Sequence, residues 1–321
     1  MTLHIREREV RELLTMQMAV AAVEEISAKQ AAGIVTVHPR RRFELPGGGF
    51  FHYMAAMDTE AGFVAMKQYT YVKGKLRFLV PLYEIATGEL LALIEADFMG
   101  QQRTGAASGV ATKFLAKKTA RVAGIIGTGG QAKTQLEAVN SVRLLESAYV
   151  YGRDPARRNR FCDEMAERLN IPIYPVESSG AAVRSADVVC TATTSSQPVV
   201  LGEDLPHGVH INAIGANHAN KRELDAVAIS RANLIFVDSV AQSRQEAGDL
   251  IIPFEKDAGQ WQKVRELADL VAGKATGRTS DSQTTLFKSN GIASWDLAVA
   301  TRVYRMAREC GIGQELPFWQ E

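Results

Sequence analysis

The chain has 321 residues, of which 46% are hydrophobic and 23% charged, an ordinary globular composition with enough length for two domains. Its formal net charge of +1 provides no long-range field that would attract nucleic acid or an anionic membrane. No apolar run is long enough to span a bilayer, the six histidines show no metal-ligand spacing, and the three cysteines form no C-x-x-C pair, so we expect a cytoplasmic protein without a structural metal.

The first hundred residues are predicted to form helices and then an antiparallel sheet. Residues 7–32 show helical periodicity, with Thr15 as a helix cap and Gly33 as a stop signal. The apolar runs that follow are separated by short Gly-containing connections typical of hairpins, which indicates a meander. The predicted strands cover residues 50–57, 63–72, 76–83 and 90–96.

A cluster of three arginines, Arg40, Arg41 and Arg42, precedes the predicted meander. A solvated charged loop is one interpretation. The other is capture of a substrate carboxylate, because a guanidinium binds a carboxylate in a bidentate fork. Farther along, Arg103 is a single bulky cation among small residues, which indicates a positioned group.

Lys67 lies inside the second predicted strand. Alternation along that strand puts it on one face with Ala65, Tyr69 and Tyr71. This face is either solvated, or it belongs to a site in which a partly buried lysine titrates nearer neutrality and donates a proton. The pattern alone does not decide between the two.

The segment from residue 122 to residue 154 has the order strand, glycine-rich turn, helix and second strand. The turn has the G-x-G-x-x-A form of the dinucleotide fingerprint, and it reads Gly127-Thr128-Gly129-Gly130-Gln131-Ala132. Gly127 allows a tight turn, Gly129 lets a pyrophosphate approach the backbone, and Ala132 lets the helix pack on the strand. The helix N-terminus offers unpaired N–H groups to phosphates. A purely structural glycine turn is the alternative, but the complete context favours a dinucleotide site.

The end of the second strand bears on the choice between NAD and NADP. An acidic residue at this place holds the ribose 2′-OH, whereas an arginine accommodates a 2′-phosphate. Here Gly152 is followed by Arg153 and Asp154. Arg153 favours NADP, but Asp154 is also available to the ribose, and both residues also suit the start of the next helix.

Strands and helices alternate after residue 154, which predicts a doubly wound parallel sheet. The expected strands cover residues 172–176, 187–192, 210–214 and 234–237. Ligands of such sheets bind beyond the carboxyl ends of the strands. Thr191, Thr193, Gly215 and Asn217 are therefore candidates to contact nicotinamide or substrate, although Ser/Thr-rich turns are common.

The domain organisation follows from these patterns. A helix over residues 103–118 leads into the dinucleotide-binding region, and a long amphipathic helix over 294–309 ends at Gly311. The apolar face of that last helix is too large for an isolated surface helix, so we expect it to pack on the first domain. We predict an α/β protein in which a Rossmann domain, residues 117–291, is inserted into an α+β substrate-binding and dimerisation domain, residues 1–116 and 292–321.

Several of these segments together resemble the ornithine cyclodeaminase/mu-crystallin family over nearly the whole chain. The matching segments are Pro39-Arg40-Arg41, Met66-Lys67, and residues 102–107, 126–132, 191–193, 210–215, 235–238 and 285–289. The resemblance implies a homodimer. It further implies that Arg41 and Arg103 hold the substrate α-carboxylate, that Lys67 faces the reacting carbon or its nitrogen, and that nicotinamide exchanges a hydride with that carbon.

The chain departs from the family pattern in two places. Met54-Ala55 stands where the family often has Met-Pro, and Asn217 stands where cyclodeaminases and some alanine dehydrogenases carry an aspartate. A neutral amide cannot act as a base or neutralise an ornithine ammonium group. Asn217 is therefore expected to contact substrate without supporting deamination.

We accordingly expect an NAD(P)-dependent oxidoreductase that interconverts a small imino acid and an amino acid. Candidates are a ketimine reductase, an amino-acid dehydrogenase and an iminosuccinate-type reductase. One alternative is an ornithine cyclodeaminase, which releases ammonia and recycles its NAD. The other is a non-catalytic binding protein similar to mu-crystallin.

Overall fold

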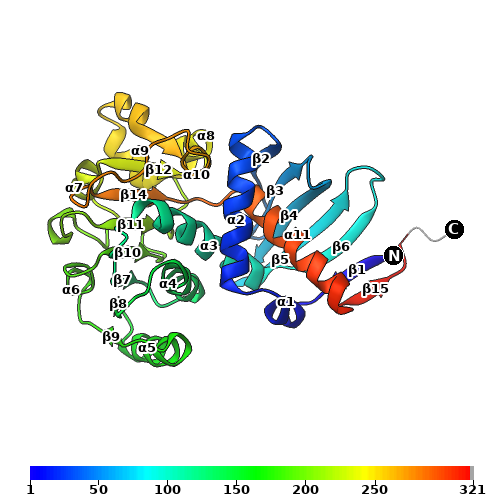
Figure 1. Cartoon of the computed structure of the whole chain (residues 1–321), viewed down its shortest axis with the longest axis horizontal. Helices are drawn as coiled ribbons and strands as arrows, with labels where there is room; N and C mark the ends of the chain where they lie inside the picture. The colour runs from blue at the N-terminus through cyan, green and yellow to red at the C-terminus, as the bar shows by residue number, and fades with distance from the viewer. Residues whose placement is uncertain (319–321) are drawn as a thin grey trace. The chain divides into compact units, whose positions relative to one another are not determined.

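The computed structural model describes residues 1–318, and the chain divides into two compact units (Figure 1). Unit 1 comprises Met1–Thr104 and the segment that begins at Gly291, and unit 2 comprises Gly105–Asn290. The first division falls within helix α3 (Asp97–Leu115), and the second lies just before helix α11 (Ala293–Cys310). The predicted domain boundaries at residues 116 and 291 stay a prediction.

Unit 1 is built on a seven-stranded sheet in the order β15-β1-β6-β5-β4-β3-β2. The central strands form the predicted meander, and β1 joins it in parallel with β6. The predicted strands are present, whereas β1, β2 and β15 were not expected as strands. Their bounds are β1 (Thr2–Ile5), β2 (Val35–Glu44), β3 (Phe50–Asp58), β4 (Phe63–Val72), β5 (Lys75–Glu84), β6 (Leu90–Glu95) and β15 (Gln314–Leu316).

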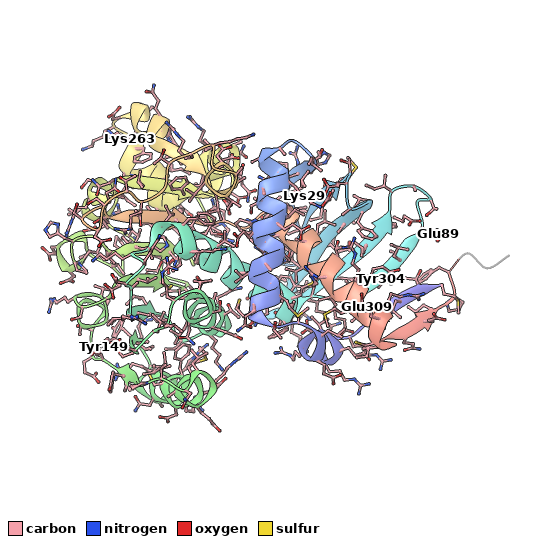
Figure 2. All side chains as sticks on the ribbon, viewed as in Figure 1. Lys29, Glu89, Tyr149, Lys263, Tyr304 and Glu309 are labelled. Carbon is pink, nitrogen blue, oxygen red and sulfur yellow. The ribbon has the colours of Figure 1, made fainter. Side chains whose placement is uncertain are left out.

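Helices α2 (Met16–Ala31) and α11 pack against each other over this sheet, after the short helix α1 (Glu7–Leu13) (Figure 1). The hydroxyl of Thr15 accepts a hydrogen bond from the backbone N–H of Met18, so Thr15 is the predicted cap. Lys29 of α2, labelled in Figure 2, forms an ion pair with Asp58 at 3.2 Å and thereby joins the helix to the end of β3. Helix α11 ends at Gly311 in the left-handed conformation, as its sequence predicts.

Unit 2 is built on an eight-stranded parallel sheet in the order β13-β12-β14-β11-β10-β7-β8-β9. The chain runs from β7 to β9 in one direction and then returns to β10, so the strand order reverses between β7 and β10. Its strands are β7 (Val122–Ile126), β8 (Ser147–Tyr151), β9 (Ile173–Pro175), β10 (Val188–Thr191), β11 (His210–Ala213), β12 (Leu234–Val237), β13 (Val264–Glu266) and β14 (Thr285–Lys288).

Helices cover both faces of this sheet. One hydrophobic cluster joins α4 and α5 to alternate residues of the central strands, such as Ile125 and Val188. A second cluster joins α6, α7 and α9 to the residues between them, such as Ile126 and Val189. The doubly wound fold class is therefore confirmed. The helices are α4 (Gly130–Val142), α5 (Pro155–Leu169), α6 (Ser179–Val183), α7 (Ala226–Arg231), α8 (Val240–Glu246), α9 (Gly248–Phe254) and α10 (Leu267–Val271).

Within residues 1–318, none of the helices combines the length and the hydrophobicity that crossing a membrane requires.

Candidate functional site

A pocket of about 520 Å³ opens in unit 2 at the carboxyl ends of β7 and β10, where the strand order reverses. This is the place at which open parallel sheets bind their ligands. Six residues predicted to bind the cofactor line it, namely Gly127, Thr128, Gly129, Arg153, Asp154 and Thr193. The three remaining fingerprint residues, Gly130, Gln131 and Ala132, form the first turn of α4.

The glycine turn of this pocket fits a dinucleotide. Gly127 has a φ of +117°, and a Cβ built on it would come within 2.4 Å of the carbonyl oxygen of Ala192. Gly129 is the N-cap of α4 and provides no side-chain oxygen to the N–H groups of the first turn. Those N–H groups are therefore available to an anion.

The cationic end of the pocket is formed by Arg153 and Arg157. Asp154 accepts a hydrogen bond from the backbone N–H of Arg157 at 3.0 Å and so caps α5, one of the roles considered from the sequence. Arg157 in turn donates from Nε to the carbonyl of Thr128 at 3.2 Å, whereas Arg153 is exposed. A Cβ at Gly152 would lie 2.7 Å from Thr128, so an acidic side chain cannot replace Gly152 without a shift.

Two of the predicted cofactor-binding residues do not lie on the wall of this pocket. Thr191 is fully buried and donates its hydroxyl hydrogen bond to Glu223, and the backbone N–H of Gly215 donates to the same carboxylate. Neither residue lines this pocket, and the cofactor contact predicted for Thr191 and Gly215 stays a prediction. Asn217 is half-buried in the loop that follows β11.

Unit 1 contains a buried cluster of charges around Lys67. The Lys67 side chain is only 4% exposed, so it does not belong to a solvated sheet face. Its Nζ donates to Oδ1 of Asp296 at 2.9 Å, and Nε of Arg103 donates to the same oxygen at 3.1 Å. Asp296 is itself 1% exposed and comes from the first turn of α11. The structure thus unites two predicted residues with an acid that the sequence analysis missed.

The surroundings of Lys67 lower its pKa to about 8. Burial is the main cause, and the positive charges of Arg103 and Arg40 act in the same direction, while Asp296 opposes them. The Phe78 ring lies 5.2 Å from Nζ. A lysine with this pKa is able to give up a proton near neutral pH and to regain it from solvent.

The arginine that approaches Lys67 is Arg40, and Arg41 is exposed on the other face of β2. His38 and Arg41 pair with Ala55 and Tyr53, so Pro39 and Arg40 both stand opposite Met54 in a β-bulge. Met54 faces inward beside its cross-strand partner Lys67. The Nη2 of Arg40 donates to the carbonyl of Gly291 at 3.4 Å. The structure therefore does not bring the predicted residue Arg41 together with Lys67 and Arg103.

Two buried polar atoms of this charge cluster are unsatisfied. Within residues 1–318, Nη1 of Arg103 and Oδ2 of Asp296 have no hydrogen-bond partner. Buried polar groups are nearly always hydrogen-bonded, and exceptions occur at sites that take a ligand or water. An unsatisfied guanidinium N–H beside a buried lysine is the arrangement expected of a carboxylate site.

Comparisons with known proteins identify the family of the chain. Residues 2–311 match the ornithine cyclodeaminase/mu-crystallin family. The chain is 39% identical over 247 residues to a Delta(1)-pyrroline-2-carboxylate reductase of Bacillus cereus, covering 77% of this chain and 76% of that protein. It superimposes on the Thermococcus litoralis Delta(1)-pyrroline-2-carboxylate reductase in complex with NADH and L-proline with a TM-score of 0.94 and 35% identity, covering 98% and 100% of the two chains.

A third relative is an archaeal alanine dehydrogenase, solved as a dimer with bound NAD. Its TM-score is 0.92 and its identity 32%, with 99% of both chains covered. The relatives share hydride chemistry at a C–N bond, so the predicted class of NAD(P)-dependent oxidoreductase acting on CH–NH or C=N bonds is confirmed. The chain belongs to the ornithine cyclodeaminase/mu-crystallin family.

Proposed function

We propose that the protein reduces a small cyclic imino acid of the Δ1-pyrroline-2-carboxylate type to the corresponding amino acid with NAD(P)H. The observation that carries this proposal is the buried Lys67–Asp296–Arg103 cluster. It combines a proton donor with a pKa of about 8 and an unsatisfied guanidinium N–H, which are the two groups that an imino acid requires. The reductases of Bacillus cereus and Thermococcus litoralis support the choice of substrate.

In this mechanism Arg103 and Arg40 bind the substrate carboxylate. The glycine turn at Gly127 and Gly129 and the N-terminus of α4 would hold NAD(P)H, which would provide the hydride for the carbon of the C=N bond. The Lys67 ammonium donates a proton to the imine nitrogen, so that the nitrogen gains a proton as the carbon gains a hydride. Lys67 then takes a proton from solvent, and Asp296 holds its Nζ in place at 2.9 Å throughout. The test is substrate-dependent loss of the reduced-nicotinamide absorbance with Δ1-pyrroline-2-carboxylate.

A second function, ammonia-releasing cyclisation of ornithine, is disfavoured because the cluster around Lys67 carries more positive than negative charge. Lys67 and Arg103 share the single carboxylate of Asp296, Arg40 adds a further positive charge that acts on Lys67, and Asn217 adds no negative charge. A non-catalytic role similar to mu-crystallin is disfavoured because it gives no reason for a buried lysine with a lowered pKa.

Ornithine and lysine are therefore expected to be poor substrates. A buried ammonium without a partner costs about 3 kcal/mol or more, so kcat/KM for ornithine cyclisation is expected to fall about 10²-fold or more below that for reduction of a neutral or dicarboxylic imine. Steady-state rates with both substrate classes, together with an assay for released ammonia, measure this difference. Ornithine turnover that equals or exceeds imine reduction contradicts the proposal.

For the cofactor we propose a preference for NADP. Arg153 is exposed at the pocket, Arg157 lies beside it, and Gly152 leaves no place for an acid that would hold a ribose 2′-OH. The carboxylate of Asp154 is engaged in capping α5. The pocket therefore offers more positive than negative charge to the ribose.

The Arg153→Ala variant is expected to bind NADPH about 10-fold more weakly while its affinity for NADH changes little, because a hydrogen bond to a charged group is worth ~1.5–3 kcal/mol and exposure reduces this. Calorimetric titration with both nucleotides measures the two affinities. Arg160→Ala is the matched control, since Arg160 is an exposed arginine of α5 that does not line the pocket. Equal losses for NADPH and NADH indicate that Arg153 does not bind a 2′-phosphate.

Two further features stay proposals. A homodimer is supported by the dimeric archaeal alanine dehydrogenase. A cytoplasmic location rests on cysteine usage in the sequence.

A further inference from the structure

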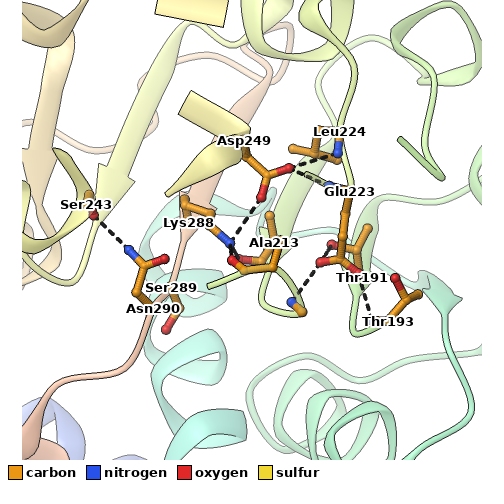
Figure 3. A network of polar contacts seen from close by, with 12 residues as sticks. Thr191, Thr193, Ala213, Glu223, Leu224, Ser243, Asp249, Lys288, Ser289 and Asn290 are labelled. Atoms are coloured by element: carbon orange, nitrogen blue, oxygen red, sulfur yellow. Dashed lines mark hydrogen bonds and ion pairs between the residues drawn. The ribbon is translucent and has the colours of Figure 1, made fainter. Parts of the chain in front are cut away.

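Glu223 is a buried carboxylate that joins the ends of two neighbouring strands (Figure 3). Its Oε1 accepts a hydrogen bond from the backbone N–H of Thr193 at 2.7 Å. Its Oε2 accepts from the hydroxyl of Thr191 at 2.8 Å and from the backbone N–H of Gly215 at 2.7 Å. One side chain therefore satisfies three donors, one from the last residue of β10 and two from the loops after β10 and β11.

A second pair of buried charges, Lys288 and Asp249, holds the segment between β11 and residue 224 (Figure 3). Lys288 donates to the carbonyl of Ala213 at 3.3 Å and to that of Ala216, and it forms an ion pair with Asp249 at 3.1 Å. Asp249 accepts hydrogen bonds from the backbone N–H groups of Glu223 and Leu224, at 2.7 and 2.9 Å. The loop between β11 and residue 224 is thus held at both ends.

The loops around Glu223 are also closely packed against one another. A Cβ at Gly215 would lie 2.3 Å from the carbonyl oxygen of Thr193, and a Cβ at Gly127 would lie 2.4 Å from that of Ala192. Thr193 and Ala192 line the nucleotide pocket. A displacement of the Glu223 carboxylate therefore shifts the wall of that pocket.

Burial of these three charged side chains carries a large desolvation cost. Glu223, Asp249 and Lys288 are all fully buried, and together they contain two acids for one base. Burial raises the pKa of Glu223, while Lys288 acts in the opposite direction. Buried ionic groups are often no better for stability than apolar residues of similar volume, so a positional role accounts for them better.

We propose that Glu223 is a positioning residue for hydride transfer, which fixes the pocket wall at Thr193 against the nicotinamide half of the dinucleotide. This inference rests on the proposed function. Glu223 does not line the pocket, so it acts through Thr193 and the loop after β11. The adenosine half of the nucleotide would lie toward Arg153 and Asp154, so its binding is expected not to depend on Glu223.

The Glu223→Gln variant tests this inference because it preserves shape and removes one acceptor. In this variant an amide NH₂ group replaces one carboxylate oxygen, so it faces an N–H or O–H donor that this oxygen satisfies in the wild type. We expect turnover to fall about 10²-fold, the effect of a displacement of about 1 Å at a reacting centre. Affinity for the reduced dinucleotide that the wild type uses is expected to fall about 10-fold. Affinity for the matching ADP-ribose or its 2′-phosphate is expected to be unchanged.

Glu203→Gln is the control, because Glu203 is an exposed acid of unit 2 that does not line the pocket. Equal turnover in Glu223→Gln and Glu203→Gln overturns the inference, and so does an equal loss of ADP-ribose and dinucleotide affinity accompanied by a lowered Tm. If Glu223→Gln does not fold, the Thr191→Val variant is measured in its place, because it removes only one of the donors to Glu223. Unchanged turnover in Thr191→Val also overturns the inference. Failure of the wild type to bind a dinucleotide or to reduce an imino acid contradicts the proposed function instead.

Discussion

Replacement of Lys67 by Met is expected to lower kcat for imine reduction about 10²–10⁴-fold, the contribution that a general acid makes in other enzymes. Methionine keeps the length and the apolar part of the side chain but has no proton to donate. Because Lys67 belongs to unit 1 and the glycine turn to unit 2, dinucleotide affinity is expected to be unchanged. Steady-state kinetics and calorimetric titration with the nucleotide measure the two quantities separately.

A matched control for this variant is available on the next strand. Lys75 begins β5 and is exposed, so Lys75→Met changes the same residue type in the same sheet away from the charge cluster. Its kcat is expected to equal that of the wild type. Near-normal turnover in Lys67→Met would show that another group donates the proton, and the assignment of Lys67 as the acid would then be wrong.

The Asp296→Asn variant is expected to lose activity at neutral pH and to recover part of it at lower pH. Lys67 donates a proton only as an ammonium ion, so wild-type activity is full below its pKa and is lost as the pH rises through about 8. The negative charge of Asp296 raises that pKa against burial and the two arginines. Removal of this charge lowers the pKa of Lys67 further, so a smaller fraction of Lys67 is protonated at neutral pH.

The measurement for Asp296 is the pH profile of kcat. The fall in activity is expected at a lower pH in Asp296→Asn than in the wild type. Glu309→Gln provides the control, because Glu309 is an exposed acid near the end of the same helix α11 (Figure 2). A uniform loss of activity at every pH, with the descending limb still near pH 8, contradicts a role for Asp296 in setting the pKa of Lys67.

Much of the fold could be predicted because its signals are local. The Thr15 cap and the Gly311 terminus depend on a few neighbouring residues, and the fingerprint from Gly127 to Ala132 depends on one turn between a strand and a helix. Strands β1 and β14 were missed because each is recognised only by its pairing with distant segments: β1 pairs with β6, and β14 lies between β11 and β12. The cationic run and Pro39 hid β2, because prolines and charges are unusual in strands.

The candidate site was less predictable because its contacts join distant parts of the chain. Asp296 stands 229 positions after Lys67, and their pairing is invisible without the packing of α11 on the sheet. One local signal was present, since Asp296 directly follows Trp295 on the buried face of an amphipathic helix. The choice between Arg40 and Arg41 depended on the bulge opposite Met54, which the sequence does not reveal.

The bulge in β2 has a consequence for changes in chain length. A one-residue deletion inside a regular strand turns every later side chain to the opposite face. In β2 the extra residue is Pro39, which lines the outer surface with His38 and Arg41 while Arg40 faces inward. Deletion of Pro39 would leave Arg40 opposite Met54, Arg41 opposite Tyr53 and Arg42 opposite His52, as they are now. The segment can therefore shorten by one residue while the inward arginine keeps its place beside Lys67.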